Sequence, residues 1–135
     1  MRIENLLATK AKEALSELFS AEIEEKNIQI QKTKKEFDGD LTLVVFPLLR
    51  ASKKGPEQTA EIIGEWMSEN VEQVTGFNVV KGFLNLEIAS EYWLNVLSEA
   101  MKNSSFGFGK PNSLSQVMVE YSSPNTNKPL HLGHL

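Results

Sequence analysis

Two histidines near the end of the chain, His131 and His134, have the spacing of an H-x-G-H motif. If His131 opens a helix, the two rings are three residues apart and lie on the same helix face. The first helical turn offers N–H groups without intrahelical partners and the positive end of the helix dipole, which favour phosphate. Gly133 has no Cβ, so a ligand can approach the backbone closely. The pattern therefore predicts two imidazoles that donate hydrogen bonds to a nucleoside triphosphate and stabilise charge as its α-phosphate is attacked.

H-x-G-H alone is a short pattern of low specificity, which chance and a structural role could also explain. A zinc site with two histidines is a further alternative, but no third ligand is visible. The preceding residues favour nucleotide binding. We expect a short apolar strand at 116–120 and a loop rich in proline and asparagine at 121–130. A nucleotide site at the C-terminal end of a strand requires this order of elements.

The stretch from Val119 to His134, VEYSSPNTNKPLHLGH, resembles the signature of arginyl-tRNA synthetases. It covers sixteen residues and is much more specific than H-x-G-H alone. The resemblance implies that a class I catalytic domain begins here. It also implies that His131, Gly133 and His134 bind ATP, accompanied by Mg²⁺, and that the two histidines stabilise the transition state of arginine adenylation.

The same resemblance implies roles for residues inside this stretch. Ser123 and Asn125 match the residues that bind the α-amino group of the amino acid, and Glu120 matches an acidic residue that helps to shape that pocket. Lys128 matches a lysine that supplies positive charge near the phosphates in members with an incomplete second ATP-binding motif. The side-chain chemistry agrees, because a lysine ammonium is a mobile point charge and an asparagine amide both donates and accepts.

Two amphipathic helices are predicted upstream. Residues 3–19 carry an apolar stripe at helical spacing. Gly55-Pro56 opens a second helix, because proline suits a first helical turn. An apolar inner face there is opposed by a glutamate at every fourth position, which indicates a solvated face rather than a metal site. The inner face comprises Ala60, Ile63, Met67 and Val71, with Ile62, Trp66 and Val74, and the glutamates are Glu57, Glu61, Glu65 and Glu69.

A third helix is predicted over residues 91–102, with Ser90 as its N-cap. Its inner face would contain apolar side chains that recur at helical spacing. The following residues are rich in Gly, Ser, Asn and Pro, which is typical of a linker and a domain boundary. The expected inner-face residues are Trp93 or Leu94, Leu97 and Met101.

Three segments are predicted to form strands. Ile28 and Ile30 alternate with glutamines, which indicates a strand with one wet face. Residues 41–46 form a dense apolar run, short enough for a buried strand. Residues 77–88 also have strand character, with Gly82 interrupting them. The combination predicts an α+β domain over residues 1–105, with a small antiparallel sheet packed against helices.

Residues 1–105 resemble, more loosely, the additional N-terminal domain of arginyl-tRNA synthetases. The matching landmarks are Gly39-Asp40, Lys54-Gly-Pro56 and Lys81-Gly-Phe-Leu-Asn85. The turn Val80-Lys81-Gly82 departs from the family, in which many members have a Gly-Pro-Gly type of turn. The resemblance implies a domain that grips the outer corner of tRNA and contacts a base of the D-loop.

Strand periodicity indicates which residues could make that contact. The even-numbered residues 84–88 are all apolar and would face the core, so Phe83 and Asn85 would face the other way. An aromatic ring and an amide on an outer sheet face could bind one unstacked base, the ring by stacking and the amide by reading an edge. The resemblance assigns this role to Phe83 and Asn85. The alternative is that a helix covers Phe83 and the ring only fills core.

Composition narrows the choice of partners. The chain has 135 residues, a formal net charge of −4 and no cysteine. Disulfides and thiolate metal sites are therefore excluded, and charge alone would not coat nucleic acid. Apolar runs are too short for a membrane span, so we expect a cytoplasmic protein without a membrane partner. The basic residues that do cluster could be ordinary solvated side chains: Lys32, Lys34 and Lys35, then Arg50, Lys53 and Lys54.

We therefore interpret the chain as the N-terminal part of an arginine–tRNA ligase. Residues 1–105 would bind tRNA(Arg), 106–115 would form a linker and 116–135 would begin a truncated catalytic domain. The parent would activate arginine with ATP and transfer it to tRNA, whereas the 135 residues alone would be inactive. The alternatives are another H-x-G-H nucleotidyltransferase, of the pantetheine-phosphate or cytidylyl type, and a standalone RNA- or protein-binding module. The sequence makes no prediction of oligomeric state.

Overall fold

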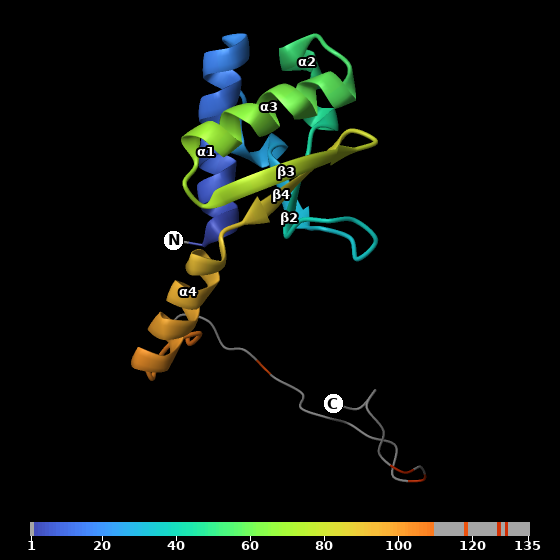
Figure 1. Ribbon diagram of the computed structural model, residues 1–135. Helices are drawn as coiled ribbons and strands as arrows, with labels where there is room; N and C mark the ends of the chain where they lie inside the picture. The colour runs from blue at the N-terminus through green and yellow to red at the C-terminus, as the bar shows by residue number, and fades with distance from the viewer. Residues whose placement is uncertain (1, 110–117, 119–126, 128, 130–135) are drawn as a thin grey trace.

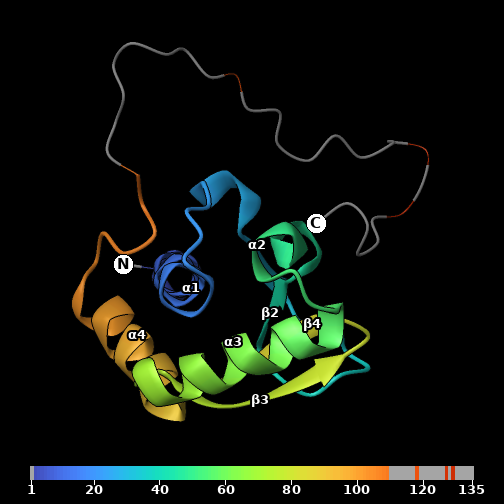
Figure 2. The ribbon, with the colours of Figure 1, turned by 90° about the horizontal axis from the view of Figure 1, so that it is seen from above.

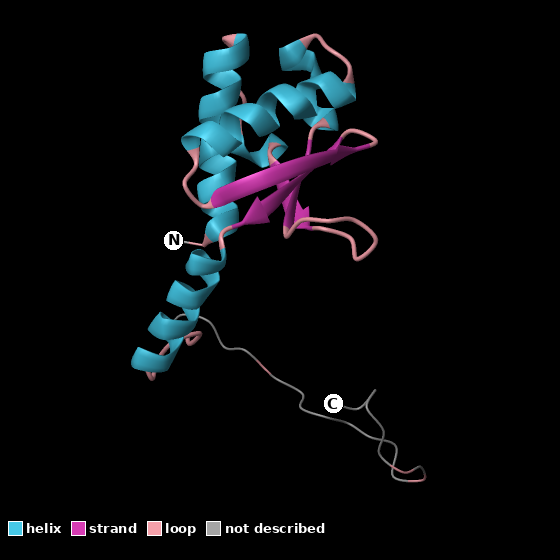
Figure 3. Ribbon diagram, in the orientation of Figure 1, coloured by secondary structure: helices cyan, strands magenta, loops and turns pink. Residues whose placement is uncertain are grey.

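The computed structural model describes residues 2–109 and, beyond them, positions 118, 127 and 129. It contains a four-stranded antiparallel sheet and helices, which confirms the predicted α+β class (Figures 1 and 3). The elements, in chain order, are α1 (Ile3–Phe19), η1 (Glu25–Asn27), β1 (Gln29–Lys32), β2 (Leu41–Val44), η2 (Phe46–Leu48), α2 (Leu49–Ser52), α3 (Pro56–Asn70), β3 (Val74–Val80), β4 (Phe83–Ile88) and α4 (Ser90–Lys102).

The core lies between one face of the sheet and the helices α1 and α3. Leu7 and Leu15 of α1, Met67 of α3, and Leu84 and Leu86 of β4 are fully buried in a single apolar cluster. Figure 2 shows α3 running along β3, with α1 and α2 farther from that strand. The 3.6-residue period of the helices and the two-residue period of the strands therefore meet in one core, as the apolar patterns predicted.

The strand order β1-β2-β4-β3 makes β1 and β3 the edge strands. β2 pairs with β4 through Leu43 opposite Leu84, and β4 pairs with β3 in the hairpin that follows α3. Alternation along each strand divides the sheet into a core face and an outer face. The core face carries leucines, and the outer face is the one on which the sequence placed the tRNA contact.

A two-residue turn joins β3 to β4. Lys81 (φ 49°) and Gly82 (φ 77°) both have positive φ, as the hairpin turn that matches strand twist requires. A Cβ on Gly82 would lie 2.7 Å from Cβ of Pro56, so only glycine fits between this turn and the start of α3. The turn thus packs against α3 although its sequence departs from the Gly-Pro-Gly type.

Helix α3 contacts the sheet through a glycine. The ring of Phe77 on β3 lies so close to Gly64 that a Cβ there would be 2.4 Å from a ring carbon. Gly64 is buried, and Ile63 beside it is fully buried. The missing side chain therefore lets α3 approach β3 closely. Most of the predicted inner face of this helix is buried, whereas Ile62 and Trp66 are half-buried. The four glutamates are exposed, as predicted.

Helix α4 differs from its prediction in two respects. It begins at Ser90, with Ala89 as an N-cap that makes no side-chain hydrogen bond, so Ser90 as the cap was wrong. The predicted inner face is exposed, and no residue of α4 is buried against the rest of the described chain. The exposed fractions on this face are 43% for Trp93, 63% for Leu94, 57% for Leu97 and 81% for Met101.

The predicted strand at 116–120 and the catalytic motif lie outside the described residues, apart from isolated positions. The same holds for the predicted linker after residue 109. No helix in the described ranges combines the length and the apolar character that crossing a membrane requires. The predicted site residues outside the described part are Glu120, Ser123, Asn125, Lys128, His131, Gly133 and His134.

Candidate nucleic-acid interface

A row of half-buried apolar side chains crosses the outer face of the sheet. Val44 of β2, Phe83 of β4 and Val80 of β3 are direct cross-strand partners, and all three are half-buried. At the β1 end of the row, Gln29 pairs with Val44 and is exposed. Because their strand neighbours Leu43 and Leu84 face the core, these side chains point away from α1 and α3.

Phe83 contacts a second aromatic ring. Phe46, in η2, lies edge-on to Phe83, with ring centroids 5.5 Å apart and an interplanar angle of 73°. Phe46 is 46% exposed, and its ring also covers the Gly82 turn, where a Cβ would lie 3.1 Å from a ring carbon. An edge-to-face pair holds both rings in defined orientations. Phe83 is thus packed against Phe46 and is only half-buried.

The neighbouring row on the outer face is polar and buried. Asn85 pairs across the sheet with Thr42 on one side and Asn78 on the other. The Thr42 hydroxyl donates to Oδ1 of Asn85 (2.7 Å), and Nδ2 of Asn85 donates to Oδ1 of Asn78 (2.9 Å). The Thr42 hydroxyl also lies 2.9 Å from that of Thr33. Asn85 is only 1% exposed, so the expectation that its amide lies on an accessible surface was wrong.

The loop at residues 33–40 explains this burial. Nδ2 of Asn78 donates to the backbone carbonyl of Asp38 (2.8 Å), and the Asp40 amide donates to the carbonyl of Leu86 (2.8 Å). Gly39 adopts φ 112°, and a Cβ there would lie 3.1 Å from Cβ of Asn85. The loop therefore folds onto the outer face and covers the amide. Strand periodicity predicts the face on which a side chain lies, but it does not predict which loop covers that face.

Replacing Asn85 with alanine should lower the free energy of unfolding of this chain by about 1–3 kcal/mol, because buried polar partners lose their hydrogen bonds. Urea unfolding followed by circular dichroism measures the change. The matched control is Asn95→Ala, since Asn95 is an exposed asparagine on α4. Equal stabilities of the two variants would contradict the structural role given to the buried row.

Lysines lie near the aromatic pair. Lys81, in the β3–β4 turn, lines a shallow hollow with Gly55 and Pro56 at the start of α3. Lys53 and Lys54 immediately precede that segment, and all three lysines are exposed. None of them forms an ion pair with a residue in the described ranges. Exposed ammonium groups of this kind could bind phosphate.

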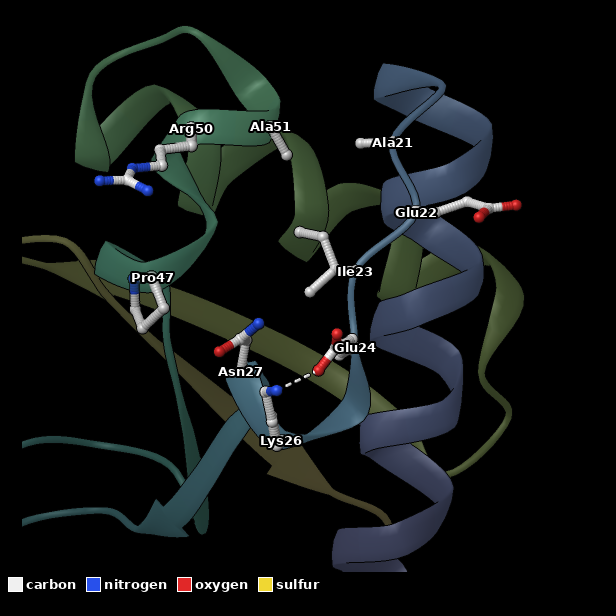
Figure 4. A pocket seen from close by; sticks show the side chains of 9 residues that line it. All are labelled: Ala21, Glu22, Ile23, Glu24, Lys26, Asn27, Pro47, Arg50 and Ala51. Carbon is white, nitrogen blue, oxygen red and sulfur yellow. Dashed lines mark ion pairs between the residues drawn. The ribbon is translucent and has the colours of Figure 1, made fainter.

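A larger hollow, of about 500 Å³, lies between the end of α1 and the η2–α2 segment (Figure 4). Ile23 and Asn27 line it, and Lys26 forms an ion pair with Glu24 at its rim. It holds no nucleophile with an adjacent base. In the part of the chain that the structure describes, no group of three or more His, Cys, Asp or Glu residues could hold a metal ion.

The comparisons with known proteins agree with this description. Residues 5–88 match the family model of the arginyl tRNA synthetase N terminal domain. The chain belongs to this family. The match covers every element from α1 to β4, and therefore both the aromatic pair and the buried polar row.

Curated relatives extend the likeness of this arginyl-tRNA synthetase domain to the whole chain. The arginine–tRNA ligase of Bacteroides thetaiotaomicron is 54% identical over 100% of the chain, and that of Porphyromonas gingivalis is 52% identical. The arginine–tRNA ligase of Flavobacterium psychrophilum is 44% identical, also over 100% of the chain. The solved structure of Thermus thermophilus arginyl-tRNA synthetase is similar with a TM-score of 0.60 and 26% identity over 98% of the chain.

The chain spans 23% of the length of the Bacteroides relative and 21% of the Thermus protein. Likeness over its full length favours a synthetase over the two alternatives, a different H-x-G-H enzyme and a standalone binding module.

Sequence reasoning missed Phe46 and the apolar row beside Phe83. The available signal was Phe46 at the end of an apolar run, directly before Pro47.

Proposed function

We propose that this chain is the tRNA-contacting N-terminal domain of an arginine–tRNA ligase, and that its partner is the D-loop corner of tRNA(Arg). The observation that carries the proposal is the half-exposed ring of Phe83, oriented by Phe46 on the outer sheet face. One unstacked base of the D-loop would lie on that ring. Stacking of a base on an aromatic side chain contributes about 1–3 kcal/mol.

The lysines beside the aromatic pair would position the RNA backbone. Lys53, Lys54 and Lys81 are exposed and lie near the turn that precedes Phe83. The chain as a whole carries a net charge of −4, so attraction to RNA must come from such a local cluster. Contacts to phosphate fix the register of the RNA and carry no sequence information, whereas the stacked base supplies selectivity.

This proposal gives Asn85 a structural role in place of the base contact expected from the sequence. Its amide hydrogen-bonds within the sheet, and the 33–40 loop covers it. Reading a base edge directly would require that loop to move. We therefore assign Asn85 to holding the surface on which Phe83 and the loop lie, and we place the direct base contact on Phe83.

The catalytic part of the proposal rests on the family and on the sequence. Arginine would be activated by ATP in the cytoplasm, with Mg²⁺ accompanying the triphosphate, and then transferred to tRNA(Arg). His131, Gly133, His134 and Lys128 would bind ATP. Ser123, Asn125 and Glu120 would bind arginine. The 135 residues alone should give no ATP–pyrophosphate exchange above background, because the chain covers less than a quarter of its relatives.

Replacing Phe83 with leucine in a full-length synthetase that carries this sequence should raise KM for tRNA(Arg) at least about fivefold, because leucine keeps apolar volume but cannot stack. kcat at saturating tRNA and KM for ATP and arginine should stay unchanged. Aminoacylation kinetics with each substrate varied in turn separate the effect on KM for tRNA from effects on kcat and on the other KM values. The control is Phe83→Tyr, which retains a stacking ring and should behave like the parent. An unchanged KM for tRNA in the leucine variant would refute the proposed contact.

A further inference from the structure

Helix α4 carries an apolar stripe that nothing in the described chain covers. Trp93, Leu94, Leu97 and Met101 recur at helical spacing on one face, and all four are exposed. The opposite face carries polar residues, which are also exposed except for the half-buried Ser98. A helix with such a division normally buries its apolar face. The polar-face residues are Glu91, Asn95, Ser98, Glu99 and Lys102.

The first turn of α4 contacts the rest of the domain. Tyr92 packs against the core cluster and stands edge-on to Trp93, with centroids 5.1 Å apart. Trp93 also lines a hollow with Glu4 of α1 and Asp40. Beyond this turn the helix projects away from the sheet and from α1 (Figures 1 and 3). The apolar stripe therefore faces outward over most of its length.

Two aromatic side chains in the segment after α4 are exposed as well. Phe106 is 46% exposed and Phe108 is 82% exposed in the segment that follows α4. Contiguous exposed apolar surface marks a site of protein or membrane contact. The polar face of α4 carries two glutamates and one lysine, which does not favour an anionic lipid surface. The stripe therefore fits a protein partner better than a membrane.

We propose that this face of α4 docks on the catalytic body of the full-length synthetase, which presents an apolar groove to it. The inference rests on the proposed function, because it requires the chain to work as part of a synthetase. Two observations favour this occupant. The relatives carry more than three quarters of their length outside the match, and α4 is the last described helix before the segment that bears the predicted catalytic motif.

The test compares α4 in two settings, the 135-residue chain and a full-length synthetase that carries it, both without tRNA. Hydrogen exchange measured by mass spectrometry should show amides of residues 90–102 at least about tenfold slower in the full-length protein, because docking suppresses local opening. In the full-length protein, Leu97→Asp should remove most of that protection. Asn95→Asp introduces the same charge on the polar face and should leave the protection intact.

Equal exchange in the two settings would overturn the proposal, as would identical behaviour of the two aspartate variants. Dimerisation of the 135-residue chain that Leu97→Asp abolishes would also overturn it, because a second copy would then be the occupant. Sedimentation velocity measures that outcome. In the isolated chain, Leu97→Asp should leave the melting temperature unchanged, which shows that the variant folds. Since no tRNA is present, failure of the Phe83 contact would not affect any of these readouts.

Discussion

Replacing His131 and His134 with alanine, singly, should lower ATP–pyrophosphate exchange by a full-length synthetase carrying this sequence about 100- to 1,000-fold. Each imidazole is proposed to donate a hydrogen bond to charge that develops at the α-phosphate. Removing one preorganised donor of this kind typically costs about 10²–10³ in rate. The exchange reaction, with arginine, ATP and tRNA all saturating, measures this step directly.

Histidine to asparagine is the matched control, because an amide can still donate a hydrogen bond from a similar position. We expect the asparagine variants to retain more exchange than the alanine variants. Binding of tRNA should not change, since the histidines lie far along the chain from Phe83. Near-parental exchange in the double alanine variant would remove the basis for the assigned catalytic role.

Replacing Gly64 with alanine should destabilise the chain by up to about 2 kcal/mol, although alanine favours helix. In an unconstrained helix interior, the change from glycine to alanine stabilises by about 0.8–1 kcal/mol. Here the new Cβ would lie 2.4 Å from the ring of Phe77, so α3 or the ring must shift. Overpacking of this kind costs about 1–3 kcal/mol, which offsets the intrinsic gain or exceeds it. Urea unfolding of the 135-residue chain measures the net effect.

A second substitution in α3 should have the opposite effect on stability. The Ser68 hydroxyl is buried and has no hydrogen-bond partner among the described residues. Ser68→Ala should therefore stabilise the chain by about 1 kcal/mol, since it removes an unsatisfied polar atom and improves helix propensity. A stabilising Gly64→Ala would mean that helix propensity, and not contact with Phe77, decides the outcome at this position.

The apolar periods predicted most of the fold. The predicted helix at 3–19 coincides with α1. The predicted helix that begins at Pro56, with a glutamate at every fourth position, is α3. Residues 77–88 contain most of the β3–β4 hairpin, although β3 begins earlier, at Val74. Periodicity succeeds in these cases because each apolar stripe has a partner within the same domain. For α4 the period predicted the helix, but no apolar pattern shows whether its partner lies within the described chain.

The candidate site was predicted less completely. Alternation along β4 correctly separated Phe83 and Asn85 from the core-facing leucines. It did not predict that the loop at residues 33–40 would cover Asn85, because the contacts involved join segments forty or more residues apart in the sequence. Phe46 could not be assigned for the same reason. Its ring reaches Phe83 only through the packing of η2 against the β3–β4 turn.

The most direct test of the central claim is a cross-link from the position of Phe83. A full-length synthetase with p-benzoylphenylalanine at this position, irradiated with tRNA(Arg), should form one dominant cross-link, to a nucleotide of the D-loop. The same photoreactive residue in place of Tyr92, which follows the opposite end of β4, provides the control and should not label the D-loop. A dominant cross-link from position 83 to the anticodon or acceptor stem, or no cross-link to RNA at all, would contradict the account.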